Sequence, residues 1–330
     1  MTYRKLETLS VELELTANLR PIADAAGKTH TIRHLFEPRD VDAVNASLAA
    51  GRPLLVRGEP GAGKSQLARA AAQSLGRAFV SKVIDARTES RDLLWTFDAV
   101  RRLADAQVLG ATGVKKEKVE QELDPIRYVT PGPLWWAFDW QSAMNPADGI
   151  TVSPPPVATG CSPDDGVVVL LDELDKADSS VPNGLLDALG QGGFEGPGRR
   201  RIECGAIPPL VVVTTNEERS LPDAFLRRCL VLQLRLPPDK DHLVEWLKQR
   251  GRAHFKQDEL ADSVFEKAAQ LLADDRLRLS RQGLTPPGGA EYLDLLRAVA
   301  RSEPDHDQQL QLLERVAQFA LRKHPEDAAG

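Results

Sequence analysis

The segment from Gly58 to Ser65, which reads Gly-Glu-Pro-Gly-Ala-Gly-Lys-Ser, constrains the fold of this chain more than any other. Its three glycines permit a tight turn that brings backbone N–H groups close to an anion. Lys64 supplies a positive charge suited to the β- and γ-phosphates of a nucleotide, and the Ser65 hydroxyl is suited to Mg²⁺. An apolar run at residues 54–56 precedes the segment, and an alanine-rich run at residues 66–75 follows it. This strand–loop–helix order predicts a phosphate-binding loop rather than a simple glycine–proline turn.

The helix after the loop supports the same prediction. It begins at Gly63 and points the positive end of its dipole at the bound anion. We therefore assign nucleotide binding to Gly58, Glu59, Pro60, Gly61, Ala62, Gly63, Lys64, Ser65 and Gln66.

The length and the charge of the chain indicate its general class. Its 330 residues exceed the roughly 100–200 residues of a typical domain, so we expect two packed units. Hydrophobic residues make up 42% of the chain and charged residues 27%, as in ordinary globular proteins. The net charge of −6 argues against nonspecific attraction to DNA or to an anionic membrane. We interpret the basic run Arg199-Arg200-Arg201 as the solvated tip of a hairpin.

The cysteines and the N-terminus favour a cytoplasmic location. Cys161, Cys204 and Cys229 are odd in number and lack the spacing of a zinc site, so we expect reduced thiols. The first residues lack the apolar core of a signal peptide. No run approaches the roughly 18 apolar residues that a membrane helix needs, so we expect no membrane association.

The order of apolar patterns predicts a doubly wound α/β domain followed by a helical unit. Runs with strand character lie at residues 54–56, 79–84, 167–171, 210–213 and 231–236, and helical spacing occurs at 40–48, 66–75 and 90–106. The run at 167–171 is apolar throughout, as in a strand buried on both faces of a parallel sheet. From about residue 239 the spacing is helical only. We predict that residues 141–166, which contain three consecutive prolines, form a long exposed loop.

Four of the five tryptophans fall at positions 95, 135, 136 and 140. We favour an amphipathic helix that buries them over a surface that docks a partner.

Two adjacent acids follow the apolar strand at residues 167–171, at the end where ligands bind in α/β sheets. Asp172 is suited to holding the Mg²⁺ shell, and Glu173 to polarising an attacking water as a general base. The alternative is that the pair caps a helix beginning near Asp175. A strand that delivers two acids, in a chain with a phosphate-binding loop, favours catalysis.

Further polar residues come after the next strand. Asn216 is placed to orient the water or to contact the γ-phosphate, although an asparagine there is most often a turn former. Arg227 and Arg228 have the planar, permanently charged group that stabilises a transferring phosphoryl group from a neighbouring subunit, and a surface pair is equally compatible with the sequence. No Asn-Lys-x-Asp tetrad for guanine follows Asn216, so ATP is the expected nucleotide.

Together these motifs resemble those of an AAA+ ATPase. The segments 171–178 (Leu-Asp-Glu-Leu-Asp-Lys-Ala-Asp), 215–218 (Thr-Asn-Glu-Glu) and 221–229 (Leu-Pro-Asp-Ala-Phe-Leu-Arg-Arg-Cys) resemble the MoxR-like group more narrowly. The resemblance covers about residues 30–300. It implies a five-stranded parallel sheet in the order 5-1-4-3-2, a helical lid, and assembly into a ring that is usually hexameric. Each active site would then lie between two subunits, with Lys64, Ser65, Asp172, Glu173 and Asn216 from one and Arg228, or alternatively Arg227, from the next.

The resemblance also implies domain boundaries. An N-terminal extension would cover residues 1–30, an α/β nucleotide-binding domain 31–238 with insertions near 92–130 and 141–166, and a helical lid 239–330. The insertion near 92–130 and the hairpin at 194–202 loosely match regions that face the ring pore in relatives. One position departs from the family: Thr285-Pro286-Pro287-Gly288 stands where many lids carry an arginine that touches the γ-phosphate. Arg281 and Arg297 are candidates to substitute for it.

MoxR-like ATPases resemble chaperones that remodel or mature protein partners, often with a von Willebrand factor A domain protein. We therefore expect an ATP- and Mg²⁺-dependent ring that remodels a protein. A nucleic-acid motor or loader is the alternative that the acidic charge disfavours. An ATP-dependent regulatory scaffold is the third hypothesis.

Overall fold

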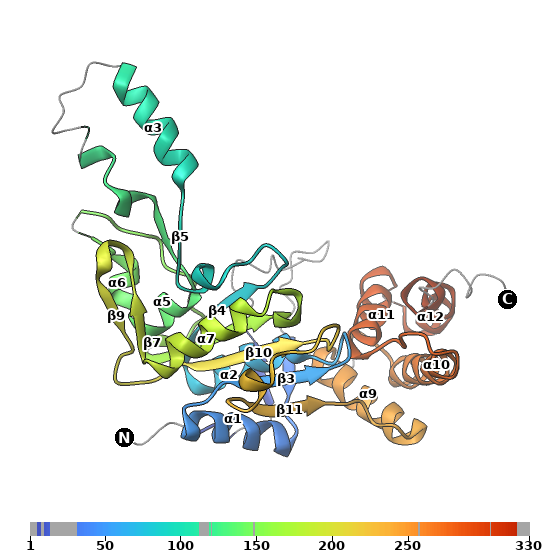
Figure 1. The fold of residues 1–330 in the computed structure, drawn as a ribbon. Coiled ribbons are helices and arrows are strands. Elements are labelled where there is room, and N and C mark those ends of the chain that lie inside the picture. Colours follow the sequence, from blue (N-terminus) through green and yellow to red (C-terminus); the bar gives the residue numbers. More distant parts are fainter. Residues whose placement is uncertain are drawn as a thin grey trace. The chain divides into compact units, whose positions relative to one another are not determined.

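A computed structural model describes residues 5–7, 10–13, 32–111, 119, 121–147, 149–256, 258–303 and 305–321 (Figure 1). The chain forms two compact units, and each is built from separate stretches of the sequence. The first comprises Met1–Leu6, Asp42–Leu55 and Ala71–Val231. The second comprises Glu7–Val41, Val56–Ala70 and Leu232–Gly330.

The described residues form the following strands and helices. The strands are β1 (Ser10–Leu13), β2 (Ile32–Leu35), β3 (Leu54–Gly58), β4 (Arg77–Val83), β5 (Trp95–Phe97), β6 (Val129–Pro131), β7 (Ser162–Asp172), β8 (Gly193–Glu195), β9 (Arg201–Glu203), β10 (Leu210–Thr215) and β11 (Leu230–Leu234). The α-helices are α1 (Pro38–Ala50), α2 (Lys64–Leu75), α3 (Ala99–Ala111), α5 (Pro133–Phe138), α6 (Trp140–Met144), α7 (Ser180–Gly190), α8 (Asp223–Leu226), α9 (Lys240–His254), α10 (Asp262–Arg281), α11 (Gly289–Ser302) and α12 (His306–Leu321). Short 3₁₀ turns lie at Ser90–Leu93, Pro125–Tyr128, Leu174–Lys176 and Pro197–Arg199.

The main sheet has five strands in the order β11-β3-β10-β7-β4. Numbered along the sheet-forming strands alone, this is the order 5-1-4-3-2, which confirms the predicted parallel α/β fold. β7 pairs in parallel with β10, where Leu210 lies opposite Val168, and with β4, where Val80 lies opposite Val169. Because residues 167–171 are apolar and rich in β-branched side chains, they are buried as the C-terminal half of β7.

The first unit buries the tryptophans of the short helix α5 in its core. Trp135 and Trp136 are 1% and 5% exposed, and α5 packs on β4 and β7. The Trp135 indole N–H donates to the Ser142 hydroxyl at 2.8 Å, so its polar end is satisfied inside the core. Trp95 instead lies half-buried on β5, and Trp140 half-buried at the start of α6.

Two sequence expectations for this unit are wrong in detail. The helix predicted at residues 90–106 is divided into a 3₁₀ turn, the strand β5 and the helix α3, because β5 pairs antiparallel with β6, with Thr96 opposite Thr130. α3 buries none of its residues, and Figure 1 shows it standing away from β4, β7 and β10. The loop predicted at 141–166 is shorter at both ends, because residues 141–144 belong to α6 and Ser162 already pairs with Arg77 at the start of β7.

The hairpin around the basic run has the expected form. β8 and β9 pair antiparallel, with Phe194 opposite Ile202, and Arg199 and Arg200 are exposed between the two strands.

The second unit contains the four helices α9–α12, which pack on one another. Their apolar faces form a core with Leu247, Phe265, Tyr292 and Leu313, each fully or almost fully buried. Of the predicted N-terminal extension, residues 10–13 form β1, which pairs antiparallel with β2, and most of the rest lies outside the described residues.

Candidate functional site

The phosphate-binding loop lies in the second unit, between β3 and α2. Gly58, Gly61 and Gly63 have φ angles of +154°, +76° and +89°, a region that side chains with a Cβ rarely adopt. A Cβ added at Gly58 would lie 2.5 Å from the carbonyl oxygen of Leu234 on β11, so only glycine fits there. The sequence therefore places glycine where the backbone adopts φ angles that other residues rarely take.

Lys64 is held close to the loop by the loop itself. Its side chain is 8% exposed, and Nζ donates to the carbonyl oxygens of Gly58 at 2.7 Å and Glu59 at 2.9 Å. The first turn of α2 closes with a hydrogen bond from the Leu67 N–H to the Gly63 carbonyl oxygen at 3.0 Å. A buried cation and a helix N-terminus thus converge on one glycine-rich turn, which is an arrangement suited to a phosphate.

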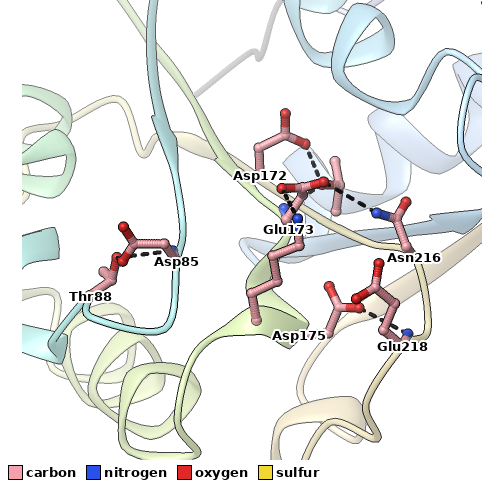
Figure 2. Close-up of polar contacts among 9 residues, drawn as sticks. Asp85, Thr88, Asp172, Glu173, Asp175, Asn216 and Glu218 are labelled. Atoms are coloured by element: carbon pink, nitrogen blue, oxygen red, sulfur yellow. Dashed lines mark hydrogen bonds and ion pairs between the residues drawn. The ribbon is translucent and has the colours of Figure 1, made fainter.

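The strand-end acids form a hydrogen-bonded cluster in the first unit (Figure 2). The Thr214 hydroxyl at the end of β10 donates to Asp172 Oδ1 at 2.5 Å and accepts from the Glu173 N–H at 2.9 Å. Asn216 Nδ2 donates to Glu173 Oε1 at 3.3 Å. The structure therefore brings together three residues that the sequence assigned to hydrolysis: Asp172, Glu173 and Asn216.

The second oxygen of the Glu173 carboxylate has a partner of its own. Lys176 Nζ lies 2.7 Å from Glu173 Oε2, and this hydrogen bond raises the pKa of Lys176. Glu173 has φ +61° and ψ +46°, a left-handed conformation that costs a non-glycine residue on the order of 1–3 kcal/mol. Strain of this kind persists only where surrounding contacts impose it, and here it aims the carboxylate at Asn216 and Lys176.

Asp175 supports the loop that carries Asn216. It is 2% exposed, and its Oδ2 accepts the Glu218 N–H at 3.0 Å. Asp175 therefore ties the turn after β7 to the turn after β10.

The paired arginines follow α8 in the first unit, and both are exposed. A third arginine holds their backbone: Arg52 Nε donates to the Arg228 carbonyl oxygen at 2.9 Å, and Arg52 Nη2 donates to the Arg227 carbonyl oxygen. The Leu230 N–H donates to the Pro53 carbonyl oxygen at 2.9 Å. The arginine segment is thereby attached to the residues that immediately precede β3.

Sequence reasoning named the acids and the amide but missed their supports. Thr214, Lys176 and Arg52 each hold a predicted site residue, yet no role was assigned to them. The signal for Thr214 was its place at the end of an apolar strand beside Thr215. Arg52 carried no signal, because its partners are backbone carbonyls 175 and 176 positions away in the sequence.

The comparison with protein families decides the class. Residues 53–229 match the AAA domain of the dynein-related subfamily, a stretch that includes the loop, the strand-end acids, Asn216 and the paired arginines. This chain belongs to the AAA domain family. It is an ATP-binding protein of the AAA+ ATPase class, whose members commonly assemble as rings.

Two solved structures are found to be similar to this AAA domain protein. An ATPase candidate from Cytophaga hutchinsonii has 13% identity and a TM-score of 0.37, with 88% of this chain and 84% of that chain covered. A single-substitution variant of the RuvB protein of Thermotoga maritima has 17% identity and a TM-score of 0.42, with 84% of this chain and 67% of that chain covered. No curated protein sequence matches the chain.

The residues present fit ATP and Mg²⁺. The positive-φ glycines and the buried Lys64 suit a polyphosphate. Mg²⁺ usually binds one or two protein oxygens together with substrate phosphates and water, and the Ser65 hydroxyl and the Asp172 carboxylate are donors of that kind.

Among the described helices, none combines the length and the apolar character needed to cross a membrane.

Proposed function

We propose that this chain is a Mg²⁺-dependent AAA+ ATPase of the MoxR-like type, which assembles into a ring and uses ATP hydrolysis to remodel a protein partner. The observation that supports it most is the cluster of Asp172, Glu173 and Asn216, because it places a strained carboxylate and a short amide at adjacent strand ends. Such a cluster suits the activation of water beside a bound polyphosphate.

Each residue has a distinct task in this proposal. Glu173 accepts a proton from the attacking water as general base, and Asn216 orients that water. Lys64 leaves the carbonyl oxygens of Gly58 and Glu59 to neutralise charge on the phosphates. Ser65 and Asp172 would hold Mg²⁺, and the ion would supply Lewis-acid polarisation of the phosphoryl oxygens.

The proposal divides the chain into an N-terminal extension at 1–30, an α/β nucleotide-binding domain at 31–238 and a helical lid at 239–330. The nucleotide-binding domain carries the insertions near 92–130 and 141–166. Its ring is a hexamer in which Arg228, with Arg227 as the alternative, reaches the site of the neighbouring subunit. The exposure of both arginines is compatible with this task. The partner is a protein, with a von Willebrand factor A domain protein as the first candidate, and the location is the cytoplasm.

ATP turnover tests the site assignment. Lys64→Ala should abolish binding of ATP at concentrations that saturate the unaltered chain, because it removes the buried cation of the loop. Glu173→Gln should keep ATP binding and lower kcat by about 10²–10⁴-fold, the usual contribution of a general base. Turnover at the unaltered rate in both variants would refute the assignment.

Capture of the partner tests the remodelling function. The Glu173→Gln chain, loaded with ATP and Mg²⁺, should retain its protein partner from a host extract in a nuclease-resistant complex. The complex should disappear when Lys64→Ala is added. If the chain instead retains nucleic acid, and nuclease treatment releases the bound proteins, the result would support a nucleic-acid motor.

A further inference from the structure

Arg276 near the end of α10 joins the phosphate-binding loop to the segment that leads into α11. Its Nη2 donates to Glu59 Oε2 at 2.5 Å, and its Nη1 donates to the Pro287 carbonyl oxygen at 2.9 Å. The Arg276 side chain is 15% exposed and that of Glu59 48%. One guanidinium thus bonds a side chain of the loop and the backbone that immediately precedes α11.

The first turn of α11 rests directly on the same loop. A Cβ added at Gly61 would lie 3.1 Å from Glu291 Oε2 and 3.2 Å from the Cβ of Ala290. A Cβ added at Gly288 would lie 3.1 Å from the Pro60 carbonyl oxygen. Glycines in the loop and before α11 therefore permit this close contact. Because the two segments are closely packed, a movement of the loop also displaces the start of α11.

Trp246 on α9 lies against the start of α11 as well. A Cβ added at Gly289 would lie 3.5 Å from its indole ring. The ring is fixed by a hydrogen bond from Nε1 to Glu37 Oε1 at 3.0 Å and by the Arg250 guanidinium stacked 3.3 Å from its centroid. A displacement of α11 would therefore change the surroundings of a rigidly held indole.

The charge of Glu59 gives Arg276 an electrostatic task. Glu59 belongs to a loop that binds a polyanion, so its carboxylate opposes ATP binding unless a cation compensates it. Arg276 supplies that cation. The sequence suggested Arg281 and Arg297 as substitutes for the lid arginine, and their surroundings differ from those of Arg276. Arg297 bonds Asp294 of its own helix at 2.5 Å, and Arg281 is exposed at the end of α10.

We propose that Arg276 is a positioning residue that couples ATP binding to the lid. Through Glu59 it neutralises the loop for the incoming phosphates, and through Pro287 it holds α11 against the loop so that the helix responds when the loop binds ATP. This inference rests on the proposed binding of ATP at this loop.

A double-mutant comparison in the full chain separates the two tasks. Affinity is measured by titration with a fluorescent ATP analogue and Mg²⁺. Arg276→Met should weaken binding about five- to tenfold, because it leaves the half-exposed Glu59 carboxylate uncompensated. Adding Glu59→Gln should restore affinity to within twofold of the unaltered chain. Lys267→Met is the matched control, since Lys267 is also on α10 and pairs with Glu314 of α12 at 3.2 Å; it should change the affinity less than twofold.

The second task is read from tryptophan emission. The unaltered chain should show an emission change on ATP binding that is lost in Trp246→Phe. In the Arg276→Met/Glu59→Gln chain this change should fall to less than half, although affinity is restored. If Arg276 had only a structural role, the double variant would not combine a restored affinity for ATP with a reduced Trp246 emission change.

The outcomes distinguish this inference from the proposed function. Unaltered affinity and an unaltered Trp246 signal in Arg276→Met would refute the coupling and leave the ATPase proposal standing. Weakened affinity that Glu59→Gln does not restore would refute the electrostatic task. Failure of the unaltered chain to bind ATP would refute both.

Discussion

At the scale of single residues, Thr214 holds the acid cluster together. Its side chain is completely buried, and its hydroxyl is bonded to both Asp172 and the Glu173 N–H. Since Glu173 has a strained backbone, the orientation of its carboxylate depends on contacts of this kind.

We predict that Thr214→Val lowers both stability and turnover. Valine has the same shape but no hydroxyl, so the Glu173 N–H loses its acceptor at a cost of about 1–3 kcal/mol. Urea denaturation should show that loss, and kcat for ATP should fall at least tenfold. Thr214→Ser, which keeps the hydroxyl, should retain most of both. Equal kcat values for the valine and serine variants would contradict the role given to the hydroxyl.

Arg52 acts on the arginine segment through its backbone. Arg52→Met removes two hydrogen bonds to consecutive carbonyl oxygens, those of Arg227 and Arg228. We predict that kcat falls about five- to tenfold while the Kd for ATP stays within twofold, because the segment and not the loop loses its support. Arg219→Met, at an exposed arginine before α8, is the control and should leave kcat unchanged. A rise in Kd with constant kcat would argue against this role.

At the scale of elements, β2 and α9 pack on each other in the second unit, and each carries a partly buried histidine. Burial lowers the pKa of His34 on β2 to about 3, with added repulsion from Arg250 and His254. Burial also lowers the pKa of His254 on α9 to about 4, with added repulsion from Arg297 and Arg250. Both imidazoles are therefore neutral in the folded chain at pH values where the unfolded chain begins to protonate.

We predict an acid-labile second unit on this basis. Both folded pKa values lie below the ordinary value of 6.5, so the unfolded state binds more protons as the pH falls below 6.5. The free energy of unfolding should fall by about 2–3 kcal/mol between pH 8 and pH 5.5, at up to roughly 1.4 kcal/mol per pH unit for each histidine. The His34→Gln/His254→Asn chain should show a markedly smaller change across that range. Identical pH dependence in the two chains would show that other groups are responsible.

At the scale of the whole molecule, a proposed ring with sites shared between subunits predicts complementation. Arg228→Ala should lose turnover but keep ATP binding, and Glu173→Gln should do the same. Mixing the two chains should restore part of the activity, because some interfaces then combine an intact Glu173 with an intact Arg228. If no mixing ratio restores activity, the arginine does not act across an interface. Arg227→Ala mixed in the same way identifies which of the two arginines acts.

The sequence by itself determined the class of fold and predicted which residues form the candidate site. The Gly58–Ser65 loop, an apolar strand ending in Asp172-Glu173, and the alternation of strands with helices are local patterns, and each is set by residues close together in the chain. From them, and from the family resemblance they carry, the parallel sheet in the order 5-1-4-3-2 was predicted correctly. The division of residues 90–106 into a turn, a strand and a helix was not predicted, because the pairing of β5 with β6 overrides the helical spacing of these residues.

Only the tertiary structure decided which side chains support the site residues. Thr214 reaches Asp172 across 42 positions of sequence, Arg52 reaches Arg227 across 175, and Arg276 reaches Glu59 across 217. Contacts over such separations leave no periodicity or spacing in the sequence, because they depend on how strands and helices are brought together. The left-handed backbone of Glu173 has the same origin. A glutamate by itself disfavours this conformation, so the surrounding packing and hydrogen bonds must impose it.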